Sequence, residues 1–110
     1  MLNLRLYLLQ RITAMIMAPL VLGHLAVMVY AIQGGLSADD ILSRTQGSLA
    51  WAVFYGLFVL AVSVHGAIGL RVIVHEWTGL RGAALGFLTW GSFAMLAIMG
   101  GRAVMAVTLA

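Results

Sequence analysis

Apolar residues occur along this chain in three long runs that two short polar segments separate. The runs extend from about residue 12 to 32, from about 48 to 74 and from about 82 to 109. A helix that crosses the hydrocarbon core of a bilayer needs about 20 mainly apolar residues. The pattern therefore predicts three membrane-spanning helices in a single domain, residues 1–110. Gly100, Gly101 and Arg102 interrupt the third apolar run.

The two polar segments are typical of connections between helices. Residues 33–47 contain Asp39 and Asp40, two of the three acidic residues, and we expect a turn-rich loop there. Residues 75–82 form a shorter segment in which Gly79 and Gly82 are helix stop signals. The second and third helices are therefore expected to be joined by a tight turn.

The composition restricts the class of protein further. Of the 110 residues, 64% are hydrophobic and 8% are charged, whereas about a quarter of a soluble domain is charged. The chain is also too apolar for disorder, and without cysteine it cannot form disulfides, thiolate zinc sites or iron–sulfur ligation. The sequence holds no nucleophile–base pair, phosphate loop or acidic metal cluster, which excludes hydrolytic and transferase chemistry. We predict an all-α membrane protein.

Basic residues in a membrane protein indicate its orientation, because they concentrate on the cytoplasmic side. Four of the six basic residues fall on one side of the predicted bilayer, namely Arg5, Arg11, Arg71 and Arg81. Arg44 and Arg102 fall on the other side. We expect a cytoplasmic N-terminus and location in the inner (cytoplasmic) membrane. The arginines form no stripe for nucleic acid, and the first run exceeds the roughly 7–15 apolar residues of a cleaved signal peptide.

Two histidines lie inside the predicted membrane spans. His24 is in the middle of the first span and His65 is in the second. Ionisable residues in a membrane are costly and mark functional sites, although a histidine can also bond a neighbouring helix. Small residues accompany both, with Gly69 one turn after His65 and Gly23 beside His24. They suit either a flat macrocycle or close helix packing, so cofactor ligation and helix packing both remain open.

The depths of the two histidines differ. At 1.5 Å per residue, His24 lies roughly 20 Å beyond Arg11, and His65 lies roughly 9 Å from Arg71. The two imidazoles are therefore about 10 Å apart in depth, which is too far for both to bind one iron. If they bind haem, each takes its own, with the opposite ligand from another chain. Arg11 and Arg71 are either ordinary interfacial residues or partners of a haem propionate or a quinone.

Two motifs resemble those of a known family. Residues 10–14, Gln-Arg-Ile-Thr-Ala, match an Arg-x-[Ser/Thr]-[Gly/Ala] pattern that begins the family's first helix. Residues 65–71, His-Gly-Ala-Ile-Gly-Leu-Arg, match His-x-x-x-Gly-[Ile/Leu/Met]-Arg, with Glu76 in place of the usual Asp. Over essentially its whole length, the chain resembles the membrane-anchor cytochrome b subunits of succinate:quinone oxidoreductases and fumarate reductases.

The resemblance implies a three-helix anchor that forms half of a haem-binding helical bundle. The other half is a second anchor subunit or a second copy of this chain. Flavoprotein and iron–sulfur protein subunits would dock on the cytoplasmic side, and electrons would pass between iron–sulfur clusters and membrane quinone. One or two haem b groups are implied for each pair of anchor halves.

The resemblance also assigns roles to single residues. His65 matches the family's axial haem ligand on the second helix, and His24 resembles the first-helix ligand of the two-haem members. Arg11 matches the arginine near the quinone and the haem propionates, and Thr13 matches the hydroxyl residue beside it. The chain departs from the pattern at Val72, where the family often has histidine. It departs again at Trp77, where one anchor type has a quinone-bonding tyrosine.

Two other functions compete with this interpretation. The chain could be a haem-free anchor or accessory subunit of a respiratory complex, in which both histidines are structural. It could also be a small oligomeric transporter with His24 and His65 along its path, although no inverted repeat is evident. A b-type absorbance band in the purified protein favours the cytochrome b anchor over both alternatives.

Overall fold

The computed structural model describes residues 3–109, and helices account for nearly all of them. In chain order the helices are α1 (Leu4–Gly34), α2 (Ala38–Thr45), α3 (Leu49–Thr78) and α4 (Gly82–Thr108). By length and composition, α1, α3 and α4 can each cross a membrane. The predicted class, an all-α membrane protein with three spanning helices, is confirmed for this part of the chain.

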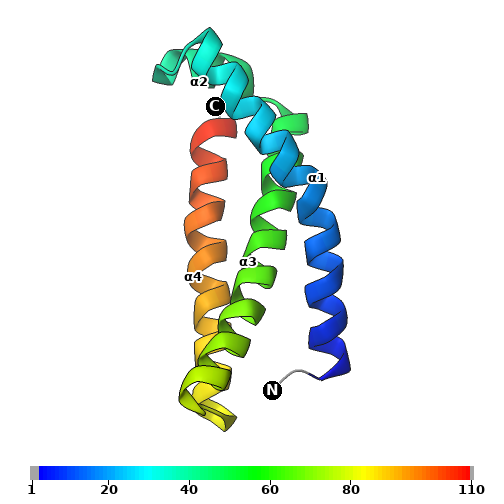
Figure 1. The fold of residues 1–110 in the computed structure, drawn as a ribbon. Coiled ribbons are helices and arrows are strands. Elements are labelled where there is room, and N and C mark those ends of the chain that lie inside the picture. The colour runs from blue at the N-terminus through cyan, green and yellow to red at the C-terminus, as the bar shows by residue number, and fades with distance from the viewer. Residues whose placement is uncertain (1–2, 110) are drawn as a thin grey trace.

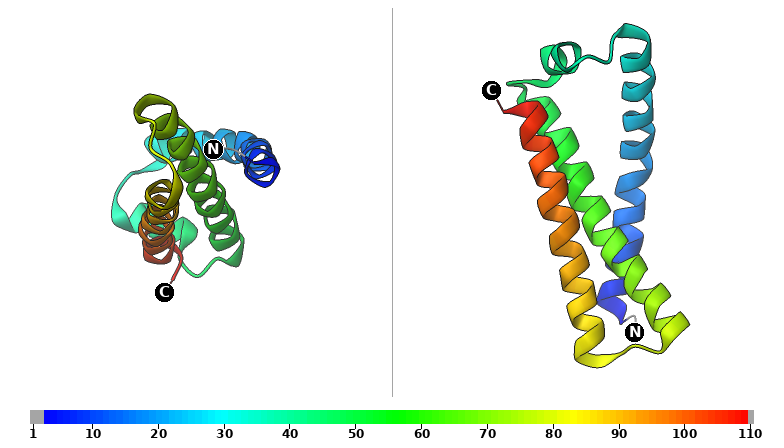
Figure 2. Two further views of the ribbon diagram at one scale, coloured as in Figure 1. Left: turned by 90° about the horizontal axis from the view of Figure 1, so that it is seen from below. Right: turned by 90° about the vertical axis from the view of Figure 1, so that its left-hand side faces the viewer.

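The long helix α3 lies between α1 and α4 and packs against both of them (Figures 1 and 2). The start of α1 and the α3–α4 turn lie at one end of the bundle, here called the N-terminal end. The short helix α2 and the C-terminus lie at the other, here called the α2 end. The molecule is 47 Å long and so exceeds the roughly 30 Å hydrocarbon core of a bilayer.

The apolar run predicted that the first helix begins near residue 12. In the structure it begins at Leu4. Asn3 caps it, because its side-chain oxygen accepts a hydrogen bond of 2.9 Å from the backbone N–H of Leu6. The helix then continues through Pro19 to Gly34. The apolar run marks the part that suits lipid, while the cap decides where the helix starts.

The helix α4 continues through residues 100–102, where the apolar run of the sequence is interrupted. Gly100 faces α3, where an added Cβ would lie 2.6 Å from Cγ1 of Val59. The missing side chain therefore allows α3 and α4 to approach each other closely. Here a glycine serves packing between helices, and it does not end the helix.

The connection over residues 33–47 was predicted as a loop, but it contains the helix α2. Ser37 and Asp40 form a capping box at its start, in which each side chain bonds the other residue's backbone N–H. At the C-terminal end of α2, the Thr45 hydroxyl donates a 2.6 Å hydrogen bond to the carbonyl of Val107. The backbone N–H of Gly47 donates to the carbonyl of Thr108 at 2.7 Å. The connection thus satisfies carbonyls at the end of α4 that have no partner within that helix.

The expected tight turn between the second and third spans is present. α3 extends to Thr78 and ends at Gly79, which adopts a left-handed backbone conformation with φ 75°. The imidazole Nδ1 of His75 lies 2.7 Å from the carbonyl oxygen of Leu80. Only residues 79–81 then separate α3 from α4.

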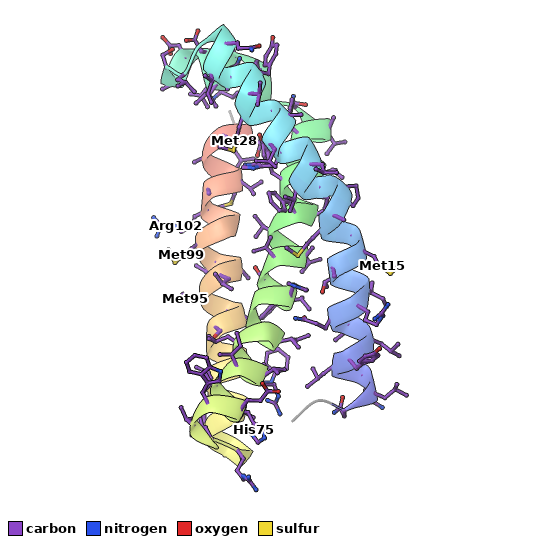
Figure 3. All side chains as sticks on the ribbon, in the orientation of Figure 1. Met15, Met28, His75, Met95, Met99 and Arg102 are labelled. Carbon is purple, nitrogen blue, oxygen red and sulfur yellow. The ribbon has the colours of Figure 1, made fainter. Side chains whose placement is uncertain are left out.

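Apolar side chains cover much of the outer surface of the bundle. Four apolar residues are fully buried among the described part of the chain: Ala61, Ala67, Ile68 and Leu85. Met15, Met95 and Met99 instead point outward (Figure 3). Such faces suit contact with lipid chains or with helices of a neighbouring subunit.

Candidate functional site

The imidazole of His65 meets the hydroxyl of Thr13 where α1 crosses α3. The His65 Nδ1 and Thr13 Oγ1 atoms are 3.2 Å apart, which is hydrogen-bonding distance. The same hydroxyl lies 2.7 Å from the backbone carbonyl oxygen of Leu9, one turn earlier in α1. Thr13 is buried, with 6% of its surface exposed. The structure therefore joins one residue from each of the two sequence motifs.

Gly69 follows His65 by one turn of α3 and also faces α1. An added Cβ on Gly69 would lie 3.5 Å from Nε2 of Gln10. Gly66 faces the other neighbour, because its added Cβ would lie 3.2 Å from Cδ1 of Leu96 on α4. In this chain the small residues around His65 thus serve close packing of helices, which is one of the two uses that the sequence left open.

The two candidate arginines, Arg11 and Arg71, lie near the N-terminal end but contact different partners. The Arg11 guanidinium is 5.8 Å from the centre of the Tyr7 ring, on its own helix. Arg71 donates a 3.0 Å hydrogen bond from Nη1 to the hydroxyl of Thr89 on α4. Within residues 3–109, these contacts join Arg11 to Tyr7 and Arg71 to Thr89.

The second candidate ligand, His24, lies further along α1 towards the α2 end. It follows Thr13 by eleven residues, which is roughly 16 Å of helix. Because Thr13 touches His65, the two histidines lie at well-separated levels. On α3 the His24 ring lies beside Phe58, which precedes His65 by seven residues, or roughly 10 Å of helix.

Aromatic rings surround the imidazole of His24. Its centroid lies 5.1 Å from that of Phe58 and 6.2 Å from that of Tyr55, both on α3. Next to it, an added Cβ on Gly23 would lie 3.3 Å from the Phe54 ring. Within residues 3–109, no hydrogen bond holds the His24 ring.

A cleft of about 660 Å³ opens beside His24 at the α2 end. Its lining includes His24, Tyr30, Arg44, Thr45, Trp51 and Tyr55. The Arg44 guanidinium lies 5.1 Å from the centre of the Tyr30 ring and donates a 2.8 Å hydrogen bond to the carbonyl of Gly35. The volume falls within the range of about 300–1,000 Å³ that is usual for ligand sites. Sequence analysis missed this cleft because it depends on how α2 folds back towards α4.

The part of the chain that the structure describes contains no group of three or more His, Cys, Asp or Glu side chains that could hold a metal ion. A haem iron requires less from one chain, because a single imidazole can supply one axial ligand and another chain the opposite one. His24 and His65 are each compatible with that arrangement, and His75 has its Nδ1 at the Leu80 carbonyl.

Comparison with known proteins identifies the family. A family model described as the succinate dehydrogenase/fumarate reductase transmembrane subunit matches residues 2–102. No curated protein and no solved structure matches the chain. The family match covers α1 and α3 completely and α4 as far as residue 102, and it includes both motifs. The chain therefore belongs to the succinate dehydrogenase/fumarate reductase transmembrane subunit family and is a multi-pass membrane protein.

Proposed function

We propose that this chain is a haem b-binding membrane anchor subunit that passes electrons between the iron–sulfur clusters of its complex and membrane quinone. The observation that carries the proposal is the setting of His65. Its ring lies between two membrane-spanning helices, with Nδ1 at the Thr13 hydroxyl. Among the described residues, no hydrogen bond engages the other nitrogen, Nε2.

This setting fits the chemistry of an axial haem ligand. A metal-binding histidine usually bonds a protein oxygen through one ring nitrogen and the metal through the other. A bound haem b supplies one-electron transfer, which suits exchange between iron–sulfur clusters and a two-electron quinone. A second anchor subunit, or a second copy of this chain, would supply the other imidazole.

Arg11 and Arg71 are proposed to bind the haem propionates or the quinone. A guanidinium is permanently charged and planar, so it can donate two parallel hydrogen bonds to such oxygens. Arg11 is exposed, and Arg71 also reaches a hydroxyl on α4. Thr13 belongs to the same site through its contact with His65.

His24 is proposed to bind a second haem nearer the α2 end. Its support is the cleft of about 660 Å³ beside the ring and the separation of roughly 16 Å along α1 from the level of Thr13. A haem there also needs an imidazole from the partner anchor. Two haems at different depths would connect the two faces of the membrane.

The concentration of arginines at the N-terminal end supports a cytoplasmic location for that end. We therefore propose that the flavoprotein and iron–sulfur protein subunits dock there and that the complex resides in the inner (cytoplasmic) membrane. The α2 connection would then lie on the opposite side.

The decisive experiment is haem quantitation per copy of this chain in the purified complex, for the wild type and for His65→Ala. We expect His65→Ala to lose one b-type haem. His75→Ala is the control, because its Nδ1 lies at the Leu80 carbonyl in the α3–α4 turn, and it should keep the wild-type haem content. Unchanged haem in His65→Ala would contradict the assignment and leave this histidine as a packing residue of a haem-free anchor or a transporter.

A further inference from the structure

We propose that Thr13 is a positioning residue that holds His65 in the tautomer with hydrogen on Nδ1, so that Nε2 keeps the lone pair that an iron requires. This inference rests on the proposed function, because it concerns how the ligand is presented. The haem itself would touch His65 and not Thr13. Each of the two sequence motifs contains one of these residues, but neither motif indicates a contact between them.

The argument begins with the single hydrogen of the Thr13 hydroxyl. Oγ1 has three neighbours at hydrogen-bonding distance: the carbonyl oxygen of Leu9 at 2.7 Å, that of Gln10 at 3.1 Å, and Nδ1 of His65 at 3.2 Å. A hydroxyl donates one hydrogen and accepts at its lone pairs, whereas a carbonyl oxygen only accepts. The Leu9 and Gln10 contacts can form only if the hydroxyl donates to them.

The distances assign the donor. A length of 2.7 Å is typical of an O–H···O bond, and 3.2 Å is at the long end for N–H···O. The hydroxyl hydrogen therefore goes to the carbonyl of Leu9, and Oγ1 presents its lone pairs to the histidine. Nδ1 of His65 must then carry a hydrogen and donate it to Thr13.

The hydrogen on Nδ1 determines the state of Nε2, the other ring nitrogen of His65. A neutral imidazole carries one ring hydrogen, so an Nδ1–H group leaves Nε2 as the acceptor and the potential metal ligand. The bond from Nδ1 to α1 also limits rotation of the ring about its side-chain bonds. A protein oxygen that accepts from the distal N–H of a ligating histidine fixes both its tautomer and its orientation.

The position of Thr13 itself is well restrained. Its side chain is buried between α1 and α3, and the bond to the Leu9 carbonyl selects one of the two rotamers that threonine adopts in helices. One turn of α3 beyond His65, Gly69 packs near the Gln10 side chain, which keeps the two helices close at this level. The acceptor is therefore in place before any ligand binds.

The test uses the whole complex with three variants. Thr13→Val keeps the shape but removes the hydroxyl, and Thr13→Ser keeps the hydroxyl. Thr108→Val is the matched control, because Thr108 is equally buried and also bonds the carbonyl four residues earlier, but it faces no histidine. We expect Thr13→Val to lower haem affinity about 10–100-fold, as loss of such a partner does in metal sites. It should also raise the midpoint potential of one haem, since an imidazole without this acceptor donates less electron density to the iron.

Thr13→Ser should restore the affinity and the potential, and Thr108→Val should match the wild type in both. Wild-type affinity and potential in Thr13→Val would overturn the proposal. Equal losses in Thr13→Val and Thr13→Ser would also overturn it, because they would show that packing and not the hydroxyl matters.

A second readout separates this inference from the proposed function. The full chain, labelled with ¹⁵N-histidine and kept free of haem in lipid bilayers, should show the Nδ1–H tautomer for the signal that disappears in His65→Ala. The same signal should move towards a mixture of tautomers in Thr13→Val. An Nε2–H tautomer in the wild-type chain would overturn the role of Thr13 whatever the haem content. Haem retained by His65→Ala would overturn the proposed function while this tautomer assignment stands.

Discussion

The two membrane-embedded histidines are held in different ways. His65 is fixed by a directional hydrogen bond to Thr13 on another helix. Within residues 3–109 no hydrogen bond holds the His24 ring, which lies beside the rings of Phe58 and Tyr55. A hydrogen bond selects a tautomer and a ring orientation. Ring contacts over 5–6 Å select neither. His65 is therefore a preorganised imidazole, and His24 is a less restrained one.

The less restrained imidazole, that of His24, has more free space beside it. Near His65, α1 and α3 are close enough for the Thr13 hydroxyl to lie 3.2 Å from the imidazole. Beside His24 there is a cleft of about 660 Å³. A cofactor at His65 would therefore need room on the outer face of this chain, where a partner subunit packs. A cofactor at His24 could enter the chain's own cleft.

Substitution of His24 is expected to have the largest effect among the tests of this comparison. We expect His24→Ala to lose one of two haems selectively and to leave the His65 haem with its wild-type spectrum, since the two sites lie at separate levels. Haem per copy of the chain and the reduced-minus-oxidised spectrum measure this. If a single haem is bound and His24→Ala retains it, the ring serves only to pack against Phe58 and Tyr55.

A smaller effect is expected at Arg11, near the N-terminal end. Arg11→Lys keeps the positive charge but loses the planar pair of donors. Loss of one charge-assisted hydrogen bond, about 1.5 kcal/mol, corresponds to roughly a tenfold fall in kcat/KM for quinone. Steady-state quinone reduction by the complex measures it, with membrane insertion checked in parallel. Wild-type kinetics would show that Arg11 only sets the orientation of the chain in the membrane.

The packing of α3 against α4 near the α2 end gives a third prediction. In Gly100→Ala the new methyl group would meet the Val59 side chain, and overpacking of this kind destabilises by about 1–3 kcal/mol. Gly101→Ala is the matched control, because nothing lies within 4 Å of its added Cβ. Denaturant unfolding in mixed micelles measures both variants. Equal stability of the two would show that the contact between α3 and α4 at Gly100 adapts easily to the added methyl group.

The smallest effect concerns the cap of α2, outside the membrane-spanning helices. A hydrogen bond from the Ser37 hydroxyl, followed by one from its backbone N–H, holds the pKa of the Asp40 carboxyl below its ordinary value of 3.8. A lowered pKa in the folded state means that this stabilisation is present above pH 3.8 and disappears as the pH falls through the folded value.

Hydrogen exchange of the α2 backbone, corrected for intrinsic rates, tests this prediction. We expect Asp40→Ala to lose protection at pH 5 and the wild type to approach the variant in more acidic solution. Asp39→Ala, in the same first turn of α2, should keep both the protection and its pH dependence. Protection that stays the same in Asp40→Ala would show that the contact of Thr45 with α4 alone orders this helix.

Much of the fold could be predicted from the sequence. The hydropathy of the runs determined the helical class and the three spans, because burial in lipid requires long apolar helices. The short polar segment with Gly79 indicated the tight turn. The ionisable residues within those runs also identified His24 and His65 as candidates. The capping pair Ser37 and Asp40 was present in the sequence and could have indicated α2.

Tertiary structure alone decided which side chains meet. The Thr13–His65 contact, the bond from Arg71 to Thr89 and the cleft beside His24 all depend on the rotation and offset of one helix against another. In a membrane chain nearly every face is apolar, so hydropathy does not indicate which face packs inward. Helix rotation is set instead by the fit of small residues such as Gly66 and Gly100 against side chains far away in the sequence.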